Sequence, residues 1–135
     1  MSALDAIKVT VVTGEDLPSG NGKALLHELV DLLEGWVRSG QPASIDLRSL
    51  PLTRGDYAEL RAALGSGAVS ARVEAIGPSE VRETQYPGLW WVTHFNEAGQ
   101  VVADLLEVCA VPAILPSPAD DAQEGLDRLK ETLGR

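Results

Sequence analysis

The sequence contains few cysteines, few histidines and few aromatic residues, and these shortages exclude several kinds of protein. Cys109 is the one cysteine in 135 residues, so an internal disulfide framework cannot form. The two histidines, His27 and His94, add too few ligands for a zinc or iron–sulfur site built from Cys and His. We therefore expect no metal and no cofactor in this chain.

Basic residues are also scarce. The chain has 11 Lys and Arg against 20 Asp and Glu, which gives a formal net charge of -9 at pH 7. Nucleic acids and anionic membranes are bound by clustered Lys and Arg, so we expect no nucleic acid and no membrane among the partners. No stretch approaches 18 consecutive apolar residues, and no basic segment precedes the first apolar run. The sequence therefore predicts a cytoplasmic protein without a signal peptide or a membrane span.

The residues that are present form clear patterns of helix and strand. Apolar periodicity predicts helices over residues 23–38 and 54–64, and a last helix that carries Leu126, Leu129 and Leu133. Thr53 followed by Asp56 is typical of a capping box at the start of the second helix. Short apolar or alternating runs predict strands over residues 7–12, 43–47, 69–76, 80–84, 89–95 and 100–108.

The order of these elements indicates the fold class. The first half alternates strand and helix, whereas the second half is a meander in which residues 96–99 form a hairpin turn. We expect an α+β fold with a mixed, mostly antiparallel sheet and helices packed on one face. With 44% apolar residues, residues 1–135 have enough core for a single domain.

The segment 84–96, TQYPGLWWVTHFN, holds four of the six aromatic residues. If Phe95 lies opposite Gln100 in the hairpin, alternation places Trp90 on one face and Trp91 with Phe95 on the other. The partners on the Trp90 side are more apolar, so we expect Trp90 to lie under the helices. Trp91 and Phe95 would then lie on the open face, unless an odd loop exchanges the two faces.

Large aromatic side chains on a partly polar sheet face are typical of protein contact sites. Arg72 and Glu74, on the polar side of the strand at 69–76, would share that face with Trp91 and Phe95. These four residues form the candidate partner surface. The alternative is that a terminus, a loop or a second copy of the chain covers the aromatic face, and self-pairing would make the protein a structural homo-oligomer.

The chain also offers weaker candidates for ligand binding or catalysis. The loop from Gly20 to Lys23 precedes a helix, as phosphate-binding loops do, but Ala24 stands where such loops have Ser or Thr. His27 and Asp31 are four residues apart on a helix, a spacing that suits a metal and equally a solvated ion pair. We assign neither pattern as a site.

For nucleophilic catalysis, His94 could act as a base for Cys109 or a serine, with Asp104 or Glu107 orienting its ring. No local signature of a nucleophile accompanies them, and Cys109 ends an apolar strand, where cysteine behaves as a small hydrophobe. We therefore expect no enzyme and assign no catalytic residue.

Three motifs in the middle of the chain are specific in combination. They are D-L-R-S-L-P-L from Asp46, A-L-G-x-G-x-V-S-A from Ala63, and E-T-x-x-P-G-x-W from Glu83. Through them, residues 24–116 resemble the C-terminal domain of the HupH-type, or HyaF-type, hydrogenase expression/formation proteins. Longer members of that family carry an additional N-terminal region.

The resemblance implies a role in the maturation of nickel–iron hydrogenases. It implies a non-catalytic, chaperone-like accessory protein that binds a hydrogenase subunit precursor, the small iron–sulfur subunit first of all, or another maturation protein. It implies no active site. With one cysteine, the chain would hold its partner rather than ligate a cluster itself.

Overall fold

The computed structural model describes residues 14–135, so the strand expected at residues 7–12 lies outside the described part. The described elements, in chain order, are η2 (Gly14–Asp16), α1 (Asn21–Ser39), β1 (Ala43–Asp46), η3 (Leu47–Ser49), α2 (Arg54–Leu64), β2 (Ser70–Val73), β3 (Ser79–Glu83), β4 (Leu89–Phe95), β5 (Val101–Val108) and α3 (Ala119–Thr132). None of the helices in this range is long and apolar enough to cross a membrane.

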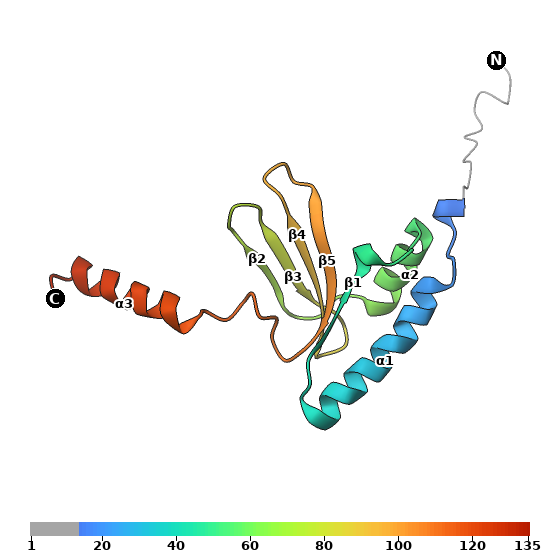
Figure 1. The fold of residues 1–135 in the computed structure, drawn as a ribbon, viewed down its shortest axis with the longest axis horizontal. Coiled ribbons are helices and arrows are strands. Elements are labelled where there is room, and N and C mark those ends of the chain that lie inside the picture. The colour runs from blue at the N-terminus through green and yellow to red at the C-terminus, as the bar shows by residue number, and fades with distance from the viewer. Residues whose placement is uncertain (1–13) are drawn as a thin grey trace, which may run out of the picture.

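The strands form one sheet in the order β1-β5-β4-β3-β2. Every pairing among these five strands is antiparallel, and β1 and β2 lie at the two edges of the sheet that residues 14–135 form. Helices α1 and α2 lie together against one end of the sheet, whereas α3 leads away from the rest of the molecule (Figure 1). The expected α+β class is confirmed, and the five described strands form an antiparallel sheet where a mixed one was expected.

Local signals fix the ends of α1 and α2. Gly40 ends α1 in a left-handed conformation, with φ of 71°, and donates its backbone N–H to the carbonyl of Trp36. Thr53 and Asp56 form the expected capping box: the Thr53 hydroxyl accepts from the Asp56 N–H, and the Asp56 carboxylate accepts from the Thr53 N–H. The capping residues in the sequence therefore specify where α2 begins.

Each face of the sheet carries a hydrophobic cluster. The larger cluster joins α1 and α2 to the sheet, and its buried residues are Leu25, Leu29, Leu47, Leu60, Leu64, Leu89, Trp91, Leu106 and Val108. The smaller one lies on the opposite face and contains Val81, Trp90 and Val92, with Cys109 and Leu115 packed against it from the segment that follows β5. The chain after β5 thus covers the face that the helices leave open.

The two adjacent tryptophans therefore lie on opposite faces, and both are buried: Trp90 is 5% exposed and Trp91 is 6% exposed. The expectation that Trp91 lies on an open face is wrong, as is the expectation that Trp90 lies under the helices. Near the hairpin turn, the β5 residues on the Trp90 side are the more apolar ones, which favours the opposite assignment. The helices instead dock at the other end of the hairpin, where Leu106 and Val108 share the face of Trp91.

The register of the β4–β5 hairpin explains why Trp90 and Trp91 lie on opposite faces, as expected, although the pairing differs. The turn at residues 96–99 forms as expected, and Asn96 donates its backbone N–H to the Gln100 carbonyl. Phe95 lies opposite Val101 rather than Gln100, which shifts the pairing by one residue. An irregularity between His94 and Phe95 adds a second residue, so that Trp90 lies opposite Glu107 instead of Leu105. A shift of two residues leaves every side chain on its original face.

Candidate functional site

Trp91 anchors a buried polar group beneath α2. Its indole N–H donates to the Asp104 carboxylate at 2.6 Å, and the Thr93 hydroxyl donates to the same oxygen at 2.9 Å. The Arg61 guanidinium lies 5.5 Å from the centre of the Trp91 ring. Burial raises the pKa of the Tyr57 hydroxyl, and the charge of Asp104 raises this pKa further. Asp104 is thus part of the core and is unavailable to orient His94.

The N-terminal end of α1 carries its own anion, the carboxylate of Asp56. This side chain is fully buried and accepts hydrogen bonds from the Ser19 backbone N–H at 2.8 Å and the Ser19 hydroxyl at 2.5 Å. Burial raises the pKa of Asp56, but the hydrogen bonds from Ser19, Thr53 and Gly22 outweigh it and hold the pKa well below its usual range.

The Asp56 carboxylate bears on whether the loop from Gly20 to Lys23 could bind phosphate. Asp56 already accepts from the backbone N–H of Gly22 in this loop and from that of Ser19 beside it, so these two amides are not open to a phosphate. A Cβ on Gly22 would stand 3.0 Å from the Asp56 carbonyl oxygen, so glycine here serves the close packing of α1 against α2. The loop is a structural joint between the two helices.

The other catalytic candidates do not converge. His94 Nδ1 lies 2.6 Å from the Ser79 hydroxyl, its cross-strand neighbour. Burial raises the pKa of the Cys109 thiol, and the charge of Glu107 adds to this, so the reactive thiolate is disfavoured. Within residues 14–135, no group of three or more His, Cys, Asp or Glu side chains could hold a metal ion.

The remaining members of the candidate surface lie at the end of the sheet farthest from the helices. Arg72 is exposed and pairs with Glu74 at 2.5 Å and with Glu80 at 3.6 Å. Phe95 is half-buried, and its backbone N–H donates to the Pro78 carbonyl, which fixes it beside the β2–β3 turn. Ile76, at the tip of that turn, is 89% exposed.

The turns of both hairpins lie at this end of the sheet, at the top of Figure 1. We call this region the distal surface and define it by five residues: Arg72, Glu74, Ile76, Phe95 and Val102, of which Val102 is also exposed. Trp91, the fourth residue of the expected surface, is excluded from it by its burial. The sequence pattern places Ile76 at the end of the strand expected over residues 69–76, but β2 ends at Val73, so Ile76 lies in the turn instead of in the sheet.

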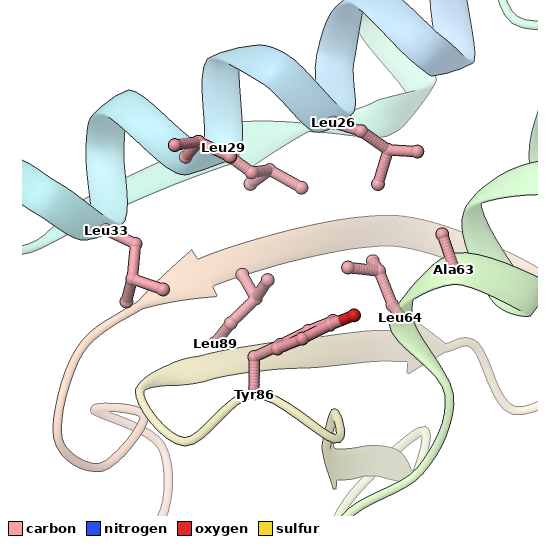
Figure 2. A pocket seen from close by; sticks show the side chains of 8 residues that line it. Leu26, Leu29, Leu33, Ala63, Leu64, Tyr86 and Leu89 are labelled. Atoms are coloured by element: carbon pink, nitrogen blue, oxygen red, sulfur yellow. The ribbon is translucent and has the colours of Figure 1, made fainter.

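A second uncovered region lies between α1 and α2. It is an apolar groove of about 300 Å³, lined by Leu26, Leu29, Val30, Leu33, Ala63, Leu64, Tyr86 and Leu89. Figure 2 shows three leucines of α1 facing Leu64 and Leu89, with the Tyr86 ring lying along the opposite side. Val30, which is 62% exposed, forms part of the rim. The signal in the sequence is that Val30 and Val37 extend the apolar stripe of α1 beyond its buried side.

Comparison with known proteins identifies the family. The model of the HupH hydrogenase expression protein, C-terminal conserved region, matches residues 20–135. The chain belongs to this family. The matched range is wider than the expected 24–116 and includes α3, so α3 is a part of the HupH C-terminal region.

Individual relatives agree. The chain is 31% identical over 117 residues to the hydrogenase expression/formation protein HupH of Rhizobium leguminosarum bv. viciae, covering 84% of this chain and 41% of that protein. It is 35% identical over 92 residues to the hydrogenase expression/formation protein HoxQ of Azotobacter vinelandii, covering 68% of this chain and 32% of that one. The chain thus spans less than half the length of these two relatives.

A solved structure shows the same fold. The hydrogenase expression protein HupH from Thiobacillus denitrificans ATCC 25259 is similar with a TM-score of 0.83 and 38% sequence identity. The similarity covers 87% of this chain and 98% of that one. The α+β architecture described above is therefore the architecture of the HupH C-terminal region.

Proposed function

We propose that this chain is a non-catalytic accessory protein in the maturation of nickel–iron hydrogenases. The observation that carries the proposal is its membership of the HupH family, whose similar members from Rhizobium, Azotobacter and Thiobacillus are named hydrogenase expression or expression/formation proteins. The finer part of the proposal is that it works by binding, in the cytoplasm, the precursor of the small iron–sulfur subunit or another maturation protein.

The polar interior supports binding rather than catalysis. Catalytic groups are held in a pocket with perturbed ionisation and with room for a substrate. Here Asp56 and Asp104, the two buried carboxylates, are each bound by donors of the chain itself. No buried side-chain nitrogen or oxygen among the described residues lacks a hydrogen-bond partner. The buried polar groups therefore serve packing.

The distal surface supports a protein partner. Ile76 is nearly fully exposed, and an ion pair of Arg72 with Glu74 lies beside it. An apolar side chain surrounded by charged groups is the arrangement of an interface centre and its polar rim. We propose that Ile76 and Phe95 contact the hydrogenase precursor, and that Arg72 and Glu74 orient it. This keeps three residues of the surface expected from sequence.

Complementation tests the proposal. In a host strain that lacks the gene for this chain, we expect hydrogenase activity to be low. Expression of the wild-type chain should restore the activity. Ile76→Glu should fail to restore activity and should no longer co-purify with the small-subunit precursor. Val69→Glu places the same charge immediately before β2, on another exposed side chain, and is the matched control that should behave as wild type. Full activity without the chain, or equal results for both variants, would show that the proposal is wrong.

A further inference from the structure

Helix α3 presents an apolar stripe that lies exposed in the described structure. Leu126, Leu129 and Leu133 are spaced three and four residues apart, so they line one side of the helix. All three are exposed, Leu129 to 57%, and α3 contains no buried residue. An isolated helix of 14 residues is marginally stable in water, since helices in proteins gain most of their stability from packing. We therefore expect another apolar surface to cover this stripe and stabilise the helix.

The groove between α1 and α2 is a matching surface. Its lining is almost entirely aliphatic, with the Tyr86 ring on one side, and it has the length of two turns of α1, from Leu26 to Leu33 (Figure 2). Such a groove accepts an amphipathic helix through leucines at this spacing. The acidic side chains of α3 lie away from the stripe and would stay in water; they are Asp120, Asp121, Glu124, Asp127 and Glu131.

The α3 of the same chain cannot reach this groove. Leu115 packs against the Trp90 cluster, on the sheet face opposite to α1 and α2. Only residues 116–118 separate Leu115 from the first residue of α3, and even fully extended they span roughly 14 Å. The path to the groove runs around a sheet edge and past the helix layer. In Figure 1, α3 accordingly leads away on the side opposite to α1.

We propose that α3 docks into the α1–α2 groove of a second copy of this chain, and that the second copy returns its own α3 to the first. Every copy carries both surfaces, so reciprocal exchange closes a two-fold symmetric dimer and leaves neither surface exposed. A helix of 14 residues is about 21 Å long. Two such helices and two grooves would bury roughly 1,200 Å² in total, which is within the range of specific interfaces.

The test is the solution mass of the full chain. Light scattering should give twice the single-chain mass of 14.3 kDa. Leu129→Glu and Val30→Glu each place a charge in the proposed contact at an exposed position, so each should shift the mass to one chain. The undocked α3 should lose part of its helical circular dichroism signal, while the tryptophan fluorescence of the folded core stays unchanged.

A control variant and a crosslinking experiment show whether the contact is specific to α3 and the groove. Ile76→Glu adds the same charge at the opposite end of the sheet and should stay dimeric, even though it should lose the hydrogenase partner. In a second experiment, Val30→Cys and Leu129→Cys are made separately in a Cys109→Ser background. Oxidising their mixture should give a covalent pair of one variant with the other, whereas each variant alone should give markedly less.

The outcomes separate this dimer from the proposed function. A wild-type chain that is monomeric at every concentration would overturn the dimer. If Leu129→Glu then also weakened binding of the hydrogenase precursor, α3 would contact that precursor instead of a second copy. A dimer that survives both glutamate variants would overturn it as well. Loss of precursor binding in Ile76→Glu would support the proposed role of the distal surface, while the mass of the same variant reports on the dimer.

Discussion

The two ends of the sheet differ in how their side chains are used. At the end near the helices, both faces are covered: α1 and α2 lie over Trp91, and the segment after β5 packs over Trp90. At the distal end, the hairpin turns extend beyond both layers, and Ile76 is almost fully exposed. We therefore expect the covered end to account for most of the stability of the fold, and the distal end to contribute little to stability and to be available to a partner.

The largest effect is expected at Trp91. Trp91→Ala should lower the free energy of unfolding by about 3–5 kcal/mol, because it removes a large core side chain and leaves the Asp104 carboxylate buried without its indole donor. Urea unfolding measures this. Trp91→Phe keeps most of the volume, so its smaller loss should report the missing hydrogen bond. If Trp91→Ala instead left stability unchanged and weakened partner binding, the face assignment would be reversed.

The second effect concerns Asp56 at the joint of α1 and α2. Asp56→Asn should cost roughly 2 kcal/mol at neutral pH, because charged hydrogen bonds are replaced by weaker and partly mismatched ones. The joint itself should remain, since Asn still accepts through its carbonyl. Denaturant unfolding of both proteins at pH 7 gives the difference.

The pH dependence sharpens this prediction. The native pKa of Asp56 is depressed, so below its unfolded value, near 4, the unfolded state binds more protons and the stability from this group is lost as the pH falls. The gap between wild type and Asp56→Asn should therefore be widest above pH 5 and should narrow towards pH 2. A gap that is constant with pH would mean that the carboxylate charge is not what Ser19 and Thr53 stabilise.

A smaller effect is expected from the cap of α2. Thr53→Ala removes the hydroxyl that accepts from the Asp56 N–H and donates to the Leu17 carbonyl, at a cost of about 1 kcal/mol. Thr53→Ser keeps the hydroxyl and is the matched control, with a smaller loss expected. The melting temperatures of the two variants, compared by calorimetry, provide the check.

The sequence predicts local features of this protein well and long-range ones less well. The capping box at Thr53, the hairpin turn at residues 96–99 and the apolar stripe of α1 depend on residues close together in the chain, and the structure confirms them. The pairing of Phe95 with Val101 at the turn and the bulge between His94 and Phe95 depend on how two strands meet, and together they place the observed register two residues from the predicted one.

The face of Trp91 could not be predicted for a similar reason. Alternation separates Trp90 from Trp91, but which of the two lies under α1 and α2 depends on helix docking at the far end of the hairpin. The pattern at Gly20 to Lys23 likewise gives no sign that Asp56, more than thirty residues later, accepts from the backbone N–H groups of Ser19 and Gly22. The exposure of Ile76 could not be predicted either, because the alternation over residues 69–76 gives no sign that β2 ends at Val73.

The most direct measurement combines binding and stability in one variant of the distal end. Purified chain is titrated with the hydrogenase small-subunit precursor by calorimetry, for wild type and for Ile76→Glu, and both are unfolded in urea. We expect the substitution to change the free energy of unfolding by less than about 0.5 kcal/mol and to weaken binding at least about tenfold. Equal affinities for the two proteins, with wild type binding well, would contradict the division of the sheet into a stabilising end and a binding end.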